Sequence, residues 1–184
     1  MNQTKKLVYT ALFTALCCVG TMVIQIPTPA THGYIHLGDA FVILSGVILG
    51  KKYGSLAAGI GSAFADIFSG YAYYAPTTFI VKFLVALTAA TLYKILTNHG
   101  VKELIAMIPC GLADIFFVVT GYFIHSYITE GVGPALLSVP SNAVQGCSGL
   151  VVAAILLPIL TAVPDIKRAK LFMNHQYTLK TAAP

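Results

Sequence analysis

The sequence predicts an all-α membrane protein with six transmembrane helices and with both termini in the cytoplasm. Three observations support this fold class. The chain of 184 residues is 57% hydrophobic and 9% charged, with a mean hydropathy of +0.82, whereas a soluble domain carries about 25% charged residues. The apolar runs are continuous and do not alternate, which favours helices over a barrel. The basic residues stand at the ends of these runs, as juxtamembrane anchors do.

The first half of the chain contains three apolar runs. We expect a helix over residues 5–26, a polar and proline-rich loop over 27–34, and helices over 35–50 and 54–70, because proline ends a helix at or before the residue that precedes it. The predicted helices over 35–50 and 54–70 are shorter than the roughly 20 residues that cross a bilayer. They are either tilted helices that are incomplete at one face or a single hairpin, and we expect the former.

The second half of the chain contains three longer runs. An aromatic loop over residues 71–75 precedes a helix over 76–96, which begins with a proline, a residue well suited to the first turn of a helix. Two further helices are expected over 102–129 and 136–163. A short basic tail over 165–184 ends the chain.

The positive charges give these helices an orientation. Cytoplasmic loops of membrane proteins are enriched in Lys and Arg. With both termini inside, the turn at Lys51 and Lys52 and the turn between Lys94 and Lys102 also face the cytoplasm. All of the 11 Lys and Arg residues except Lys82 then lie on the cytoplasmic side. These charges form no patch interleaved with exposed aromatic residues, so the sequence gives no sign of nucleic-acid binding.

Four charged residues fall inside the predicted spans: Asp39, Asp66, Lys82 and Asp114. A charge inside a membrane is expensive and either pairs with another group or has a function. Asp66 and Lys82 lie on consecutive antiparallel helices, so we expect them to form a structural ion pair. Lys82 is also a candidate contact for a ligand, and Asp39 lies near the same outer end.

Other polar side chains reach the same outer half of the predicted bundle. Asn142 and Gln145 are three residues apart and therefore share a helix face, and each offers both a donor and an acceptor. Tyr122 and His125 have the same spacing on the preceding helix, and Tyr74 belongs to the aromatic loop. Such tyrosines form either an interfacial belt or a wall for ring stacking. The convergence of these groups predicts an apolar-walled pocket that is open to the outside.

The remaining motifs exclude several kinds of chemistry. The four cysteines show no metal-ligand spacing, so we expect no metal and no cofactor. No phosphate-binding loop is present, so the chain is not expected to hydrolyse ATP. No catalytic residues are assigned, because Ala63 follows Ser62 where a serine nucleophile elbow needs glycine. Ala11 and Ala15 on the first helix are four residues apart, a spacing that lets another helix approach closely.

Several blocks of sequence together resemble the substrate-binding S components of energy-coupling factor (ECF) vitamin transporters. They are the Tyr-Ile-His-Leu-Gly-Asp-Ala segment at 34–40, the glycine-bounded run at 54–61, the Ala-Asp-Ile-Phe-Ser-Gly-Tyr segment at 65–71 and the Ala-Pro-Thr-Thr-Phe-Ile-Val-Lys segment at 75–82. The sequence is most similar to the branch that takes up hydroxymethylpyrimidine or pyridoxine-like compounds. The resemblance covers most of the chain, but the last two helices match more loosely.

The resemblance implies a single transmembrane substrate-binding domain over residues 1–184. Such a protein binds a vitamin at the outer face of a bacterial plasma membrane. It docks through an Ala-x-x-x-Ala pair, here Ala11 and Ala15, on a transmembrane coupling subunit driven by two cytoplasmic ATPases. Lys82, Tyr122, Asn142 and Gln145 fall in the region of the family's site. With Asp39, Tyr74 and His125 from the same outer half, they make up the candidate substrate-binding residues. Two alternatives stay open: a standalone proton-coupled secondary transporter, and an intramembrane enzyme.

Overall fold

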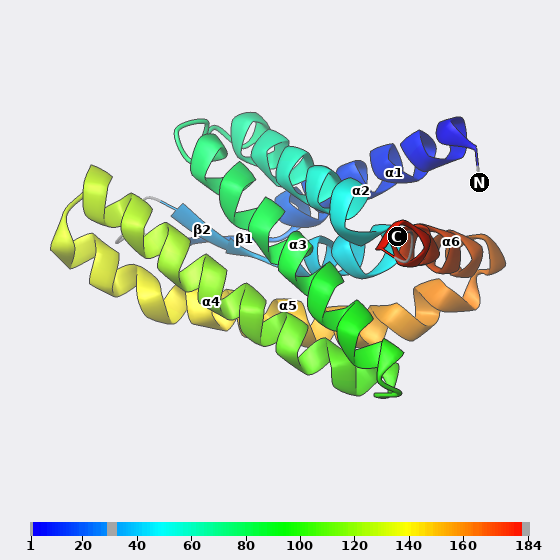
Figure 1. Cartoon of the computed structure of the whole chain (residues 1–184). Coiled ribbons are helices and arrows are strands. Elements are labelled where there is room, and N and C mark those ends of the chain that lie inside the picture. The colour runs from blue at the N-terminus through cyan, green and yellow to red at the C-terminus, as the bar shows by residue number, and fades with distance from the viewer. Residues whose placement is uncertain (1, 29–32, 182–184) are drawn as a thin grey trace.

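The computed structural model describes residues 2–28 and 33–181, with side chains to residue 174. Its helices and strands, in chain order, are α1 (Gln3–Val23), β1 (Gln25–Thr28), β2 (Gly33–His36), α2 (Asp39–Phe68), α3 (Ala75–Asn98), α4 (Glu103–Thr129), α5 (Val132–Ala162) and α6 (Pro164–Thr181) (Figure 1). Of these helices, α1 to α5 are long and apolar enough to cross a membrane. The predicted helical fold class is confirmed for the described residues. The number of spans and their orientation stay predictions.

Helix α2 reverses its direction at Gly50. This residue has a φ of 74° and a ψ of −177°, a backbone conformation that glycine adopts without a steric penalty. The Ser45 hydroxyl donates to the carbonyl of Gly54 at 3.0 Å, although nine residues of straight helix would separate these positions by about 13 Å. A Cβ atom on Gly54 would lie 2.3 Å from the Ser45 carbonyl oxygen. The two halves of α2 correspond to the predicted helices at 35–50 and 54–70.

Two segments differ from the prediction. Strands β1 and β2 form an antiparallel hairpin in which Ile26 is opposite Ile35 and Pro27 is opposite Tyr34. The end of one helix, a loop and the start of the next helix were expected there. Residues 29–32 of that predicted loop lie outside the described residues. The predicted tail forms helix α6, because Ala169, Lys170 and Met173 bury one of its faces; residues 182–184 again lie outside.

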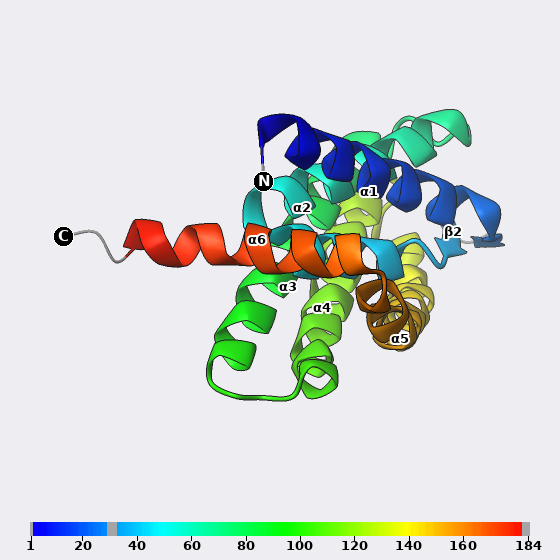
Figure 2. The same cartoon turned by 90° about the vertical axis from the view of Figure 1, so that its right-hand side faces the viewer.

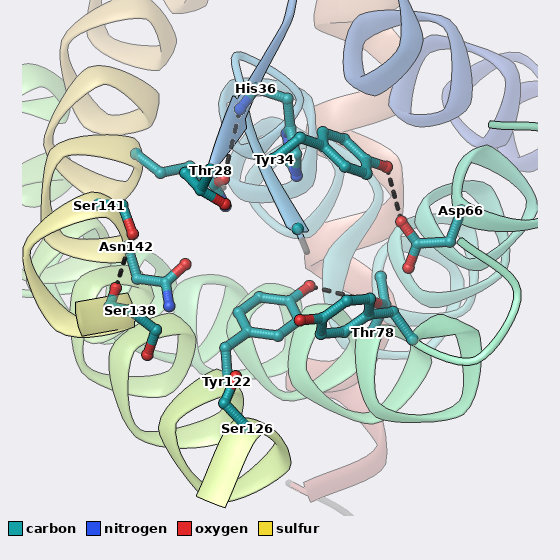
Figure 3. A pocket seen from close by; sticks show the side chains of 13 residues that line it. Thr28, Tyr34, His36, Asp66, Thr78, Tyr122, Ser126, Ser138, Ser141 and Asn142 are labelled. Atoms are coloured by element: carbon teal, nitrogen blue, oxygen red, sulfur yellow. Dashed lines mark hydrogen bonds between the residues drawn. The ribbon is translucent and has the colours of Figure 1, made fainter. Parts of the chain in front are cut away.

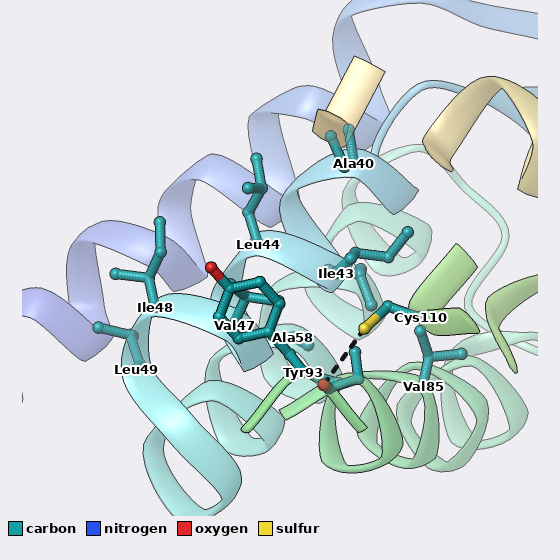
Figure 4. Packing of buried hydrophobic residues seen from close by; sticks show 14 of the residues in the cluster. Ala40, Ile43, Leu44, Val47, Ile48, Leu49, Ala58, Val85, Tyr93 and Cys110 are labelled. Atoms are coloured by element: carbon teal, nitrogen blue, oxygen red, sulfur yellow. Dashed lines mark hydrogen bonds between the residues drawn. The ribbon is translucent and has the colours of Figure 1, made fainter. Parts of the chain in front are cut away.

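The core is built around the first half of α2. Every residue from 42 to 50 is buried, which is typical of a helix surrounded by others. Apolar side chains of α3 and α4, such as Val85 and Cys110, pack against it (Figure 4). Helix α1 lies at the outside of the bundle and buries only Phe13, Cys17 and Thr21 among its described residues.

The two ends of the molecule carry different elements. The hairpin, the α2–α3 connection and the α4–α5 connection lie at one end, whereas both chain termini lie at the other (Figure 1). At that second end, α6 crosses the bundle beside α1 (Figure 2). Lys170 of α6 donates to Tyr93 and to Glu103, each at 2.7 Å, and thereby ties α6 to α3 and α4.

Candidate functional site

A pocket with an empty volume of about 460 Å³ lies at the hairpin end of the molecule. Residues from β1, β2, α2, α3, α4 and α5 line it, so distant parts of the chain contribute to one site (Figure 3). The lining consists of Thr28, Gly33, Tyr34, His36, Asp66, Tyr74, Thr78, Tyr122, Ser126, Ser138, Ser141, Asn142 and Gln145.

Gln145 forms the floor of the pocket and connects it to a buried ion pair. Its Oε1 accepts the backbone N–H of His36 at 3.3 Å, and its Nε2 donates to Asp39 Oδ2 at 2.9 Å. The other Asp39 oxygen pairs with the Lys82 ammonium, and both of these side chains are fully buried. The amide of Gln145 therefore has partners within the protein on both of its ends.

His36 lies beside this floor as a neutral ring. The pKa of His36 is lowered to about 4, chiefly by burial; the Asp39 charge raises it and the Lys82 charge lowers it by smaller amounts. The Nδ1 atom of His36 accepts the Gly38 backbone N–H at 3.0 Å. A neutral imidazole that accepts at Nδ1 carries its proton on Nε2, so this ring is a donor at its other nitrogen.

Hydroxyl groups of tyrosines organise the side of the pocket. The Tyr34 hydroxyl donates to Asp66 Oδ1 at 2.6 Å, and burial together with the Asp66 charge raises the pKa of Tyr34, which keeps the phenol protonated. The hydroxyls of Thr78 and Tyr122 are 3.0 Å apart. The Tyr34 ring also contacts the Tyr71 ring, with centroids 4.7 Å apart. These contacts fix the positions of Tyr34 and Tyr122, and both of these residues line the pocket.

The rim of the pocket is formed by the first turns of α5. The hydroxyls of Ser138 and Ser141 donate to carbonyls of their own helix, at 2.7 and 2.8 Å, and keep their acceptor capacity. The Asn142 amide makes no side-chain hydrogen bond to the described residues, and it points into the pocket (Figure 3). Together, floor and rim offer donors, acceptors and ring faces within one small volume, which suits a polar heterocycle.

A family model for the S component of ECF-type riboflavin transporters matches residues 1–162. The chain belongs to this family. It is therefore an integral membrane protein and the S component of an ECF vitamin transporter. S components of this kind bind small vitamins and associate with ECF modules. The family consists of transporter subunits and not of enzymes.

Two curated relatives are similar to this S component. An uncharacterized protein of Pyrococcus woesei is 33% identical over 134 residues, which is 73% of this chain and 86% of the relative. The thiamine precursor transporter HmpT of Lactococcus lactis subsp. cremoris (strain MG1363) is 27% identical over 164 residues, which is 86% of this chain and 89% of the relative.

Two solved structures share the fold of this S component. The S component of a bacterial ECF transporter aligns with a TM-score of 0.67 and 19% identity, covering 88% of this chain and 98% of the other. The S component for biotin from an ECF-type ABC transporter aligns with a TM-score of 0.62 and 19% identity, covering 97% and 95%. The predicted resemblance to S components is thus confirmed.

The structure brings four of the seven predicted ligand contacts to the pocket lining: Tyr74, Tyr122, Asn142 and Gln145. The other three lie behind the lining. Asp39 and Lys82 are beneath Gln145, whereas His125 stacks on the Tyr74 ring at 4.3 Å and bonds to the Thr77 hydroxyl at 2.8 Å. Ligand contact itself stays a prediction for all seven.

The predicted ion pair between Asp66 and Lys82 is wrong. Lys82 pairs with Asp39, and Asp66 accepts from Tyr34 and lines the pocket. The prediction considered only consecutive helices, whereas the reversal at Gly50 brings α2 into contact with α3 and also with α5. Ala11 and Ala15, the predicted docking pair, are exposed on α1.

The sequence reasoning assigned no role to several lining residues. Ser138 could have been found, because positions 138, 141 or 142, and 145 recur at the spacing of one helix face. Thr78 could have been found in the same way, one turn before Lys82. Tyr34 and His36 carried no such signal, because their strand lies in a segment where a loop and the start of a helix were expected.

Proposed function

We propose that this S component captures a small nitrogen heterocycle, either hydroxymethylpyrimidine or a pyridoxine-like compound, at the extracellular face of a bacterial plasma membrane. The ligand occupies the pocket between the hairpin and the ends of α3, α4 and α5. The observation that carries the proposal is the Asn142 amide in the rim, a donor and an acceptor in a pocket walled by tyrosines. The relationship to a thiamine precursor transporter supports the same choice.

The pocket favours a ligand of about one ring. Its empty volume of about 460 Å³ includes space that is open to solvent, so the enclosed part is smaller and leaves no room for a multi-ring ligand. The rings of Tyr34 and Tyr122 come from opposite walls (Figure 3). A planar heterocycle can therefore lie between them while its edges meet the polar groups.

Calorimetry on the purified full-length protein tests the ligand class. Hydroxymethylpyrimidine, pyridoxine, thiamine and riboflavin are titrated in turn. We expect one of the first two to bind with a stoichiometry near one and more tightly than thiamine or riboflavin. Tighter binding of riboflavin, or no binding of any of the four, would contradict the proposed ligand class.

Delivery is proposed to use the outer face of α1. Ala11 and Ala15 are exposed there, and the neighbouring Leu7, Val8 and Leu12 are also between 46% and 60% exposed. Small residues four apart let a helix of the transmembrane coupling subunit approach closely. Two cytoplasmic ATPases then drive the release of the ligand.

Bulky substitutions separate docking from binding. We expect Ala11→Trp and Ala15→Trp to abolish uptake in cells that contain the coupling module, with ligand affinity unchanged. Thr120→Trp is the matched control, because Thr120 is also exposed on a span-length helix but lies on α4. Uptake that survives both α1 substitutions and falls with Thr120→Trp would refute docking through α1.

Standalone proton-coupled transport by this S component, without the ATPases, is the second candidate mechanism. The observation that favours it is Asp114, a fully buried carboxyl group of α4 with no hydrogen-bond partner for either oxygen in the described part of the chain. Buried carboxyl groups of this kind serve proton relays in transporters. Uptake in cells that lack every coupling ATPase would favour this candidate, and its absence there would favour the S-component mechanism.

A further inference from the structure

The carboxylate of Asp66 lines the pocket, and one of its two oxygens accepts no hydrogen bond from the described residues. Asp66 lies near the end of α2, is 4% exposed, and lines the pocket. Its Oδ1 accepts the Tyr34 hydroxyl at 2.6 Å, but its buried Oδ2 has no hydrogen-bond partner among the described residues. Figure 3 shows this second oxygen pointing away from Tyr34 and toward Thr78.

No donor among the described residues lies within hydrogen-bond distance of that oxygen. Tyr34 has a single O–H, which Oδ1 already accepts. The Thr78 hydroxyl is the nearest donor and acts on the carboxylate, but its partner within hydrogen-bond distance is the Tyr122 hydroxyl at 3.0 Å. Lys82, the cation that acts on Asp66 electrostatically, is paired with Asp39. A buried acceptor without a partner is costly, and more so when it is charged, so a ligand that donates to it gains a corresponding advantage.

We propose that Asp66 Oδ2 accepts a hydrogen bond from an N–H group of the ligand and thereby determines specificity. The pocket then selects nitrogen heterocycles that carry an exocyclic amino group or a protonated ring nitrogen. The inference rests on the proposed function, because it takes the heterocycle pocket as given and names the edge of the ring that is read.

The negative charge of Asp66 strengthens the preference for a ligand that donates a hydrogen bond over one that accepts. A carboxylate accepts hydrogen bonds and cannot donate any, so a ligand with a carbonyl oxygen at the same position meets like-signed partial charge and leaves Oδ2 unpaired. Sites that leave a buried polar group unpaired discriminate far more strongly than apolar ones. Asn142 lies on the opposite side of the pocket (Figure 3) and, with both a donor and an acceptor, tolerates either ligand.

A matched pair of ligands tests the proposal. The probes are hydroxymethylpyrimidine, which carries an exocyclic amino group, and its N-methylated oxo analogue, in which a carbonyl replaces that group and a methyl group replaces the ring N–H. For the wild-type protein we expect the amino form to bind at least about 100-fold more tightly. In Asp66→Asn, whose amide can donate to a carbonyl, the affinity for the amino form should fall at least about tenfold and the preference should shrink or reverse.

Pyridoxine distinguishes the two possible donors. If it binds the wild type and is lost in Asp66→Asn, a protonated ring nitrogen is also read by Asp66. If its affinity is unchanged by the substitution while that of the amino form falls, the exocyclic amino group alone is read. Glu130→Gln is the control, because it removes a carboxylate from the same end of the molecule that does not line the pocket.

The failures of the two proposals differ. Equal affinity of wild-type protein for the amino and oxo ligands overturns the Asp66 inference and leaves the heterocycle pocket standing. The same holds if a folded Asp66→Asn keeps the wild-type preference. If no heterocycle of the panel binds the wild type, the proposed function fails and this inference fails with it. The wild-type comparison needs no variant, so it decides even if Asp66→Asn does not fold.

Discussion

The floor and the rim of the pocket use similar amides in opposite ways. At the floor, both ends of the Gln145 amide bond to the protein, one to His36 and the other to Asp39, which also pairs with Lys82. At the rim, Asn142 makes no side-chain hydrogen bond to the described residues and faces open space. The difference shows that floor residues maintain the fold of the site, whereas rim residues remain available to a ligand. Substitutions at the floor should therefore lower stability first, and substitutions at the rim should lower affinity alone.

The largest effect is expected from Lys82→Met. It leaves Asp39 charged, buried and short of its main partner, and breaking a buried pair in this way costs about 3–5 kcal/mol. Thermal unfolding in detergent should show a strongly lowered midpoint, and Lys82→Met combined with Asp39→Leu should recover much of the loss. A single variant as stable as the wild type would show that the pair does not support the floor.

The next largest effect is a pH dependence that comes from His36. Its pKa is near 6.5 in the unfolded chain and about 4 in the folded protein, so between these values the unfolded state binds more protons. The contribution of His36 to stability should be constant well above pH 6.5 and should fall by about 3 kcal/mol as the pH drops toward 4. His36→Gln should lack this component when unfolding midpoints are compared across the same range. An identical pH profile in both proteins would contradict the assignment.

A moderate effect is expected from Gln145→Ala. The substitution leaves the His36 N–H and one Asp39 oxygen without their partner, at a cost of about 1–3 kcal/mol. Both the unfolding midpoint and the ligand affinity should decrease. Ser148→Ala, one turn along α5 and outside the pocket lining, is the matched control. A loss of affinity without any loss of stability would show that Gln145 serves ligand binding and not the stability of the site.

The smallest effect on stability is expected from Asn142→Ala. No protein partner is lost, so the unfolding midpoint should change by less than the equivalent of about 0.5 kcal/mol. Ligand affinity should fall roughly tenfold, as for one lost hydrogen bond of about 1.4 kcal/mol. Calorimetry beside Cys147→Ala, an exposed position outside the lining, measures both quantities. A destabilised Asn142→Ala would show that the rim, like the floor, contributes to the stability of the protein.

The sequence predicted the helices well because apolar length alone determines them. Helices α3 and α4 begin and end within two residues of the predicted bounds, since proline, glycine and charge mark their ends. The hairpin was missed because two strands of four residues are too short to display their alternation. Helix α6 was missed because its stability comes from contacts of Lys170 and Met173 with the bundle, and such contacts have no local signature.

The candidate site was predictable in its location and less so in its pairings. Spacing placed Asn142 and Gln145 on one helix face and Tyr122 at the same level, and all three line the pocket. Spacing could not tell which carboxylate would meet Lys82, because that depends on how α2 folds back on itself. The same uncertainty hid the contact between Tyr34 and Asp66, whose positions are 32 residues apart.

The reversal at Gly50 determines whether the number of segments that cross the bundle is odd or even. Five uninterrupted helices joined end to end would leave the two termini at opposite ends of the bundle. The reversal within α2 makes six bundle-crossing segments out of five helices. Both termini therefore lie at the same end of the bundle (Figure 1). The left-handed backbone of one glycine thus determines that α1 and α6 share a side, where Tyr9 of α1 reaches the Asp165 carbonyl of α6. An insertion or deletion that straightened α2 at this position would reverse the direction of every helix that follows it.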